Sequence, residues 1–147
     1  MFRPIKKQDK WLYLDLTKQF YQSDAVLHDI PEQYRINAFD EMMRSSVYLE
    51  GYLFEWNGHT AGYAIINKTY SQELGGMVYG LEELFLLPQF RSKGLGREFF
   101  QWLEHDSHAR RIRLEVSPDN DRAISFYQRL GFKPLSYTQM GKDILSS

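Results

Sequence analysis

The sequence contains no cysteine, carries almost no net charge and lacks a long hydrophobic run. Without cysteine, disulfide frameworks, thiolate catalysis and cysteine-based zinc sites are excluded. A net charge of −1 argues against a nucleic-acid-binding protein, whose affinity comes from clustered Lys and Arg. The N-terminal segment Met1–Lys7 has no apolar run long enough for a signal peptide or a membrane span. We therefore expect a cytoplasmic protein that binds neither nucleic acid nor membrane.

At 147 residues, with 43% hydrophobic and 25% charged residues, the chain has the size and composition of one globular domain, residues 1–147. Helical and alternating apolar spacing indicate an α/β protein, a sheet with helices on both faces. The dipeptide Asn57-Gly58 is a strong signal for a two-residue hairpin turn. In chain order we expect a strand at 2–5, helices at 9–22 and 31–45, strands at 47–56 and 59–69, a loop at 71–77, a strand at 81–88, a helix opened by a glycine-containing loop, a strand at 112–116, a helix after Asn120, and a terminal strand or hairpin at 135–145.

The loop Arg91-Ser92-Lys93-Gly94-Leu95-Gly96 opens a helix after an apolar strand. Its two glycines let the backbone approach a ligand closely, and the first N–H groups of the helix have no internal partners. Because the helix dipole also favours an anion there, and Lys93, Arg91 and Arg97 add positive charge, the loop suits a pyrophosphate. It is neither a P-loop nor the dinucleotide motif, since Phe99 replaces the third glycine. The alternative is that Gly94 and Gly96 only form a tight turn and bind no ligand.

Two adjacent carboxylates, Glu82 and Glu83, interrupt the apolar strand before this loop. Strand alternation places them on opposite faces, so we expect at most one to face any given cleft. A partly buried carboxylate can have a raised pKa and can act as a base or hold a cation. The alternative is that one pairs with a basic side chain and the other is solvated.

A third motif runs from Asn120 through Ala123 and Tyr127 to Gly131-Phe132. Asp119 or Asn120 is expected to cap a helix, and Gly131 to end it in a left-handed conformation with Phe132 packing back. A tyrosine at position 127 is ordinarily a core aromatic with a satisfied hydroxyl.

Together the Arg91-x-x-Gly94-x-Gly96 and Asn120-x-x-Ala123-x-x-x-Tyr127-x-x-x-Gly131-Phe132 motifs resemble the GNAT superfamily of acetyl-CoA-dependent N-acetyltransferases. The resemblance covers residues 81–134. It implies a mixed, mostly antiparallel sheet of about six or seven strands with helices on both faces. The cleft for acetyl-CoA would lie between the two central strands. Homodimers occur in families of this kind.

The resemblance also implies a role for each motif residue. The backbone of Leu84, Phe85 and Leu86 would hydrogen-bond the pantetheine arm and polarise the thioester carbonyl. Tyr127 would be the general acid that protonates the departing thiolate. The strand around Glu82 is similar to that of polyamine acetyltransferases, which makes Glu82 the leading candidate to place or deprotonate the amine. The remaining cofactor contacts would come from Arg91, Ser92, Lys93, Gly94, Leu95, Gly96 and Arg97 around the pyrophosphate, and from Asn120 and Ala123 near the thiol.

The acceptor is the open question. A small primary amine would arrive protonated, with a pKa near ~10.4, and a carboxylate or water would take its proton before direct attack. Alternatives are a peptide or lysine acceptor, for which residues 20–46 would form a groove, and a non-catalytic CoA-binding sensor. Acidic residues outnumber basic ones in the front half of the chain. If they line the acceptor site, they favour a cationic amine; the alternative is that they form a solvated acidic surface. These acids are Asp24, Asp29, Glu32, Asp40, Glu41, Glu50 and Glu55, against Arg35 and Arg44.

The sequence Glu104-His105-Asp106-x-His108 has the residue types of a metal site. It falls in the last turn of a predicted helix, where histidine favours the helix dipole and acidic neighbours are ordinary surface residues. Three well-aimed ligands are not expected from one helical turn, so we expect no metal in this protein.

Overall fold

The computed structural model describes residues 1–144, which form two compact units, Met1–Ser117 and a second unit that begins at Pro118. The first unit holds one sheet and three α-helices, and the second holds a single α-helix followed by extended chain. The α/β class expected from the sequence is confirmed.

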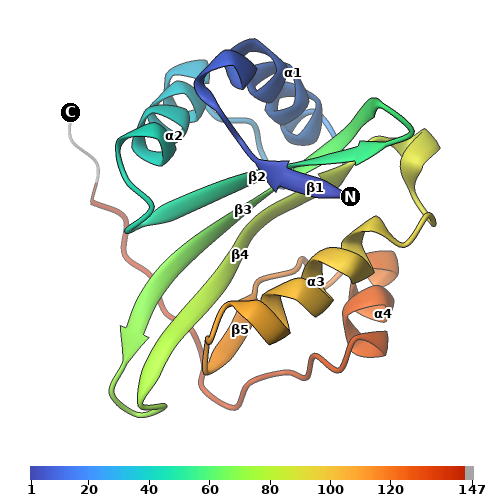
Figure 1. Cartoon of the computed structure of the whole chain (residues 1–147). Helices are drawn as coiled ribbons and strands as arrows, with labels where there is room; N and C mark the ends of the chain where they lie inside the picture. The colour runs from blue at the N-terminus through green and yellow to red at the C-terminus, as the bar shows by residue number, and fades with distance from the viewer. Residues whose placement is uncertain (145–147) are drawn as a thin grey trace. The chain divides into compact units, whose positions relative to one another are not determined.

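The sheet has five strands in the order β1-β2-β3-β4-β5 (Figure 1). The first four pair antiparallel, and β5 joins β4 in parallel. The strands are β1 (Phe2–Pro4), β2 (Leu49–Trp56), β3 (His59–Ser71), β4 (Gly76–Leu86) and β5 (Arg111–Leu114). The sheet is therefore mixed and mostly antiparallel as expected, with five strands instead of six or seven.

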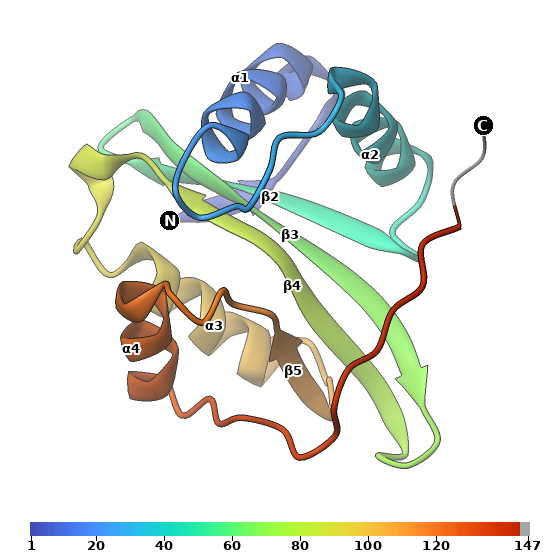
Figure 2. The same ribbon diagram turned by 180° about the vertical axis from the view of Figure 1, so that it is seen from behind.

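Helices cover both faces of this sheet. The helices α1 (Lys10–Tyr21) and α2 (Glu32–Arg44) lie side by side over one face, while α3 (Leu95–Asp106) covers the other (Figures 1 and 2). Short 3-10 turns, η1 (Lys7–Asp9) and η2 (Pro88–Phe90), precede α1 and follow β4. Alternation along β2 explains the two layers, because Leu53 joins the core under α1 and α2 while the rings of Tyr52 and Phe54 contact Phe99 of α3.

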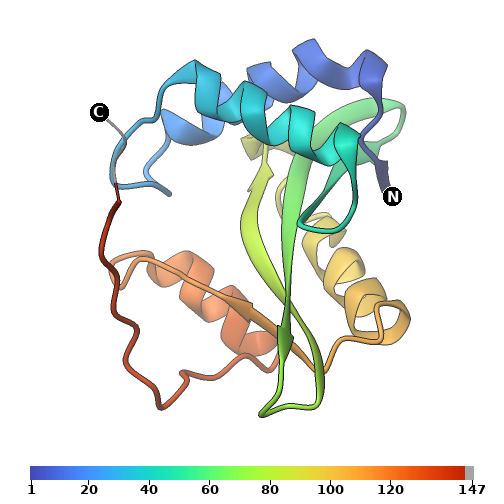
Figure 3. The ribbon, with the colours of Figure 1, turned by 90° about the vertical axis from the view of Figure 1, so that its left-hand side faces the viewer.

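Two turns organise the antiparallel strands. Asn57 and Gly58 have φ angles of 47° and 79°, the left-handed pair that a two-residue hairpin requires, as the sequence predicted. The next hairpin joins the long strands β3 and β4 and extends to its own turn at 72–75 (Figure 3). The expected loop at 71–77 is therefore too long: β4 begins at Gly76 and pairs there with Ser71.

A β-bulge interrupts β4 at Glu82. Ile66 of β3 pairs with Leu81 and Ile65 pairs with Glu83, so Glu82 is the extra residue on β4. An extra residue breaks the simple alternation of side chains and bends the strand. The bulge therefore decides where the two adjacent carboxylates point.

The second unit begins with a capped helix, α4 (Asp121–Arg129). Asn120 is the cap, and its Oδ1 accepts a hydrogen bond of 3.2 Å from the Ala123 N–H. Gly131 ends the helix at φ 95°, and the Phe132 N–H donates back to the Tyr127 carbonyl at 3.0 Å. These local predictions are confirmed.

The predicted terminal strand or hairpin at 135–145 is wrong over residues 135–144, which form no strand; Leu145 lies outside the described residues. Side chains there are exposed, and alternation without a partner strand does not by itself make a strand. Within residues 1–144, none of the helices is both long and apolar enough to cross a bilayer.

Candidate active site

A cavity of about 240 Å³ lies between α1, α2 and the sheet in the first unit. Its wall is aromatic and charged, and it combines residues from both helices with residues of β2, β3 and β4. Lining it are Tyr13, Tyr21, Ile30, Tyr34, Arg35, Ala38, Leu49, Ile65, Glu82 and Glu83. An apolar and aromatic wall with a few convergent polar groups is the usual form of a small-molecule site.

Both β4 carboxylates line this cavity, which corrects the expectation that alternation would separate them. The cause is the bulge: with Glu82 inserted opposite the Ile65–Ile66 step, Glu82 and Glu83 no longer alternate across the sheet. The site therefore holds two neighbouring acidic side chains on one wall.

Glu83 is the less exposed member of the pair, and its side chain is half-buried. Its Oε1 accepts a hydrogen bond from the Tyr63 hydroxyl at 2.6 Å, and its Oε2 accepts one from the Tyr21 hydroxyl at 2.5 Å. Burial raises the pKa of the Glu83 carboxyl, while these two hydrogen bonds oppose that rise. The same contacts and burial raise the pKa values of Tyr21 and Tyr63. Glu83 is thus a carboxylate that takes up a proton more readily than an ordinary glutamate.

Glu82 has a different environment. Its side chain is exposed, and its Oε2 accepts a hydrogen bond of 2.8 Å from the Asn67 amide. A hydrated carboxylate at the mouth of a cavity can exchange a proton with solvent directly. The two adjacent residues therefore differ in chemical character although they share one cavity.

The residues that α1 and α2 contribute to the cavity were not predicted from the sequence. Tyr13, Tyr21, Tyr34 and Arg35 line the cavity. The sequence indicated Arg35 only as one of the basic residues in the charge balance of the front half. None of the seven front-half acids lines this cavity. Asp24, Asp29, Glu32 and Asp40 are exposed, whereas the other three form ion pairs with Arg3, Arg44 and Lys68. The carboxylates of this cavity come from β4. Because the lining positions belong to five separate segments, no local spacing could have revealed them.

The loop before α3 has the geometry expected of an anion site. Ser92 and Gly94 adopt left-handed backbone conformations, with φ of 64° and 82°, and α3 begins at Leu95. Such turns gather backbone N–H groups into a concavity, next to the unpaired first turn of the helix. A Cβ at Gly94 would meet no atom within 4 Å, so the space beside Gly94 is open. These residues fit the pyrophosphate of coenzyme A.

The side chains around this loop differ in burial and in contacts. Leu95 and Gly96 are buried, so only their backbone can serve a ligand. Arg91 Nε donates to the Leu86 carbonyl at 2.9 Å and ties the loop to the end of β4. The ammonium of Lys93 lies 5.9 Å from the centre of the Trp56 ring, while Arg97 is exposed. The cations thus border the loop without filling it.

Strand β4 also has an open edge. Strand β5 pairs with it only from Val78 to Leu81, so in the described chain residues 82–86 have no strand partner on that side. Leu84, Phe85 and Leu86 lie on this stretch. Free backbone N–H and C=O groups on an open edge can bind an extended ligand. In the described sheet β5 is an edge strand, so the expected cofactor cleft between two central strands stays a prediction.

Tyr127, Asn120 and Ala123 belong to the second unit. The Tyr127 ring lies 5.4 Å from Phe126 and 5.8 Å from Phe132, measured between centroids, and burial raises the pKa of Tyr127 to about 12. The Asn120 side chain is used as the helix cap. Their contacts with a cofactor stay predictions. No group of three potential metal ligands occurs within residues 1–144.

Comparison with known proteins agrees with this geometry. The model of the Acetyltransferase (GNAT) family matches residues 12–132. The chain belongs to the GNAT family of acetyltransferases. Its membership confirms the enzyme class and acetyl-CoA as the co-substrate that were expected from the motifs.

Solved structures share the fold. An integron cassette protein from the mobile metagenome of Cole Harbour Salt Marsh is 22% identical, with a TM-score of 0.79 and coverage of 99% of this chain and 91% of that one. A possible acetyltransferase from Clostridium difficile 630 is 11% identical, with a TM-score of 0.85 and coverage of 99% and 98%. The aminoglycoside N-acetyltransferase AAC(6')-Iy, solved with a bisubstrate analog, is 20% identical, with a TM-score of 0.78 and coverage of 99% and 98%. At these identities the likeness concerns the fold.

The environment of Glu83 predicts a pH-dependent stability. Because its pKa is raised in the folded chain, its contribution to folding is greatest below the ordinary glutamate pKa of ~4.3 and is lost as the pH rises through the folded value. The stability of the wild type relative to Glu83→Gln should therefore fall as the pH rises above about 4.3, as measured by urea unfolding. Glu73→Gln, at an exposed turn, controls for the loss of one negative charge. A difference that grows with pH would contradict the assigned direction.

Proposed function

We propose that this enzyme transfers an acetyl group from acetyl-CoA to a primary amine of a small molecule by direct attack. The observation that carries the proposal is the cavity of about 240 Å³ with Glu82 and Glu83 on one wall and tyrosines around it. Carboxylates and aromatic faces both attract an ammonium group. A site of this composition suits an amine acceptor.

The residues of this chain would divide the proton transfers. An alkylamine arrives protonated, with a pKa near ~10.4, and becomes a nucleophile only after it loses a proton. Glu82, at the exposed end of the pair, is our candidate to accept that proton directly or through water, with half-buried Glu83 as the alternative. Tyr127 is our candidate to donate a proton to the departing thiolate.

The backbone would supply the remaining interactions. Bound acetyl-CoA brings the activated acetyl group as a thioester. The N–H groups of residues 92–97 would bind its pyrophosphate, and those of Leu84–Leu86 would hydrogen-bond the carbonyl as charge develops on its oxygen. Asn120 and Ala123 would contact the cofactor near the thiol. The open edge of β4 and the left-handed loop support these assignments.

The size of the cavity favours a small acceptor over a peptide. Its volume equals that of about eight water molecules at ~30 Å³ each, below the ~300–1,000 Å³ of sites that enclose drug-sized ligands. Ile30, Tyr34 and Ala38 lie within the segment that would have formed a peptide groove, and they line this cavity instead. The single domain over residues 1–147, the cytoplasmic location and a homodimer stay predictions.

Replacing Tyr127 tests the general acid. Tyr127→Phe keeps the ring and removes the proton, so we expect turnover to fall by about 10²-fold with coenzyme A affinity unchanged. The assay follows free thiol with acetyl-CoA and a panel of amines that includes polyamines. Tyr137→Phe makes the same change at a tyrosine that is 80% exposed in the same unit, and should keep full rate. Full activity of Tyr127→Phe would show that the tyrosine assignment is wrong.

Replacing Glu82 tests the base. Without its carboxylate, only the fraction of acceptor that is already neutral can react, so the pH profile of kcat/KM should move to higher pH in Glu82→Gln. Glu83→Gln is the matched comparison on the next residue. An unchanged profile for Glu82→Gln would remove Glu82 from the mechanism, and a shift confined to Glu83→Gln would transfer the role to Glu83.

Replacing Gly94 tests the pyrophosphate loop. Gly94→Ala places a methyl group in open space at a left-handed position, which costs about 1–2 kcal/mol of stability and obstructs the ligand. Gly75→Ala is the matched control, because Gly75 has a φ of 73° and equally open surroundings in the β3–β4 turn. By calorimetry, coenzyme A affinity should fall about tenfold or more only in Gly94→Ala. Equal affinities in the two variants would speak against this loop as the pyrophosphate site.

A further inference from the structure

Arg35 is a buried cation without an anionic partner. Its side chain is only 8% exposed, yet it forms no ion pair with any residue in the part of the chain that the structure describes. Its Nη1 donates to the Leu14 carbonyl at 2.9 Å and to the Thr17 hydroxyl at 3.1 Å, while its Nε is buried with no hydrogen-bond partner. Buried charges are normally paired, because an unpaired one is strongly destabilising.

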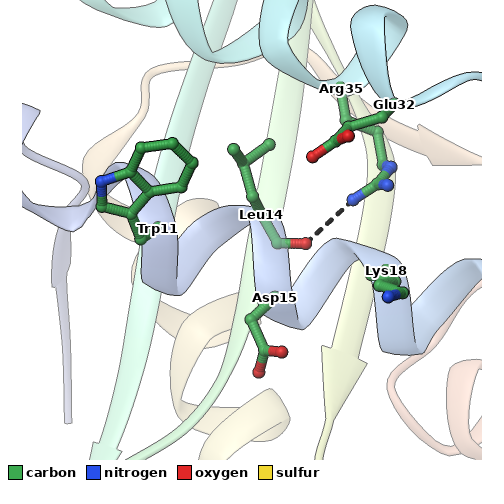
Figure 4. A pocket seen from close by; sticks show the side chains of 6 residues that line it. All are labelled: Trp11, Leu14, Asp15, Lys18, Glu32 and Arg35. Carbon is green, nitrogen blue, oxygen red and sulfur yellow. Dashed lines mark hydrogen bonds between the residues drawn. The ribbon is translucent and has the colours of Figure 1, made fainter.

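The position of Arg35 gives this charge access to ligand. Figure 4 shows the guanidinium reaching from α2 towards the backbone of α1 at Leu14. Arg35 lines the groove of about 230 Å³ drawn there, whose other charged residues are Asp15, Lys18 and Glu32. It also lines the cavity that holds Glu82 and Glu83. Arg35 therefore borders the proposed acceptor cavity from the helix side.

The acceptor cavity consequently has two charged walls. Glu82 and Glu83 lie on β4, and Arg35 lies on α2, without an ion pair between them in the described chain. The Arg35 charge still acts on Glu83, since it lowers the pKa of that carboxyl against the effect of burial. A pure polycation would satisfy the acidic wall but would face repulsion from the guanidinium.

We propose that the acceptor is a small zwitterion, an amine that also carries a carboxylate, and that Arg35 binds this carboxylate while the β4 acids receive the amine. The proposal rests on the acetyltransferase function proposed above. An arginine guanidinium presents several N–H donors in a plane that matches a carboxylate. Amino acids are the simplest compounds with both groups, and the cavity volume suits molecules of their size.

The test uses acceptors in matched pairs, each an amino acid and the amine that remains when its carboxylate is removed. Lysine with cadaverine, histidine with histamine, and tyrosine with tyramine form such pairs. In the wild type we expect kcat/KM from thiol release to be at least about tenfold higher for the amino acid of the preferred pair, the scale of a hydrogen bond to a charged group. Equal or faster turnover of the amine in every pair would overturn the proposal while leaving the acetyltransferase function standing.

Variants of Arg35 separate recognition from a structural role. Arg35→Met should raise KM for the amino acid about tenfold or more and leave the matched amine unchanged or improved. Arg35→Lys keeps the charge and should restore part of the preference, which guards against a folding defect in the Met variant. Arg44→Met is the control, because Arg44 is an exposed residue of α2 paired with Glu41. Equal loss of activity on both members of a pair would assign Arg35 to structure alone and overturn the proposal.

Binding measurements distinguish failure of this proposal from failure of the proposed function. If acetyl-CoA binds but no acceptor releases thiol, the acetyl-transfer proposal fails. Calorimetry on the wild type with saturating coenzyme A then tests the zwitterion proposal. Binding of an amino acid in preference to its decarboxylated partner would support the zwitterion site, and binding of neither, or of the amine alone, would overturn it.

Discussion

The half-buried Glu83 carboxylate, held by the hydroxyls of Tyr21 and Tyr63, is the interaction on which the rest of this site depends. These hydrogen bonds join α1, β3 and β4 at one point. A carboxylate placed there without them would be strongly disfavoured, because burial alone penalises its charge. The bulge at Glu82 places the carboxylates of Glu82 and Glu83 at the cavity. The hydrogen bonds from Tyr21 and Tyr63 reduce the free-energy cost of burying the Glu83 carboxylate.

Strand β4 has two separate specialisations along its length. At Glu82 the bulge turns the strand's acidic side chains towards α1 and α2, and from residue 82 onwards β5 no longer pairs with its other edge. One short stretch can therefore offer carboxylates to an amine and free backbone groups to a thioester. The proposed direct attack needs those two kinds of group close together, and a single strand is a rigid way to hold them.

The parts of the molecule that local chemistry determines were predictable from the sequence. The Asn57-Gly58 turn, the Asn120 cap, the Gly131 terminus and the loop at Gly94 each depend on neighbouring residues, and each was found where expected. The bulge in β4 was not predictable, because an extra residue is defined by the pairing of two strands and cannot be recognised in the sequence of one strand. The terminal strand failed for the related reason that a strand needs a partner.

The acceptor half of the site was less predictable, and its charge balance shows why the family alone does not name the acceptor. Glycine spacing predicts the cofactor loop, since backbone N–H groups would bind the ligand there. The acceptor cavity instead takes side chains from α1, α2 and three strands, so one residue can change the class of molecule that it accepts. Arg35 is such a residue: with the β4 acids alone the cavity would suit any small amine, whereas a buried guanidinium makes a second, negatively charged group on the acceptor favourable.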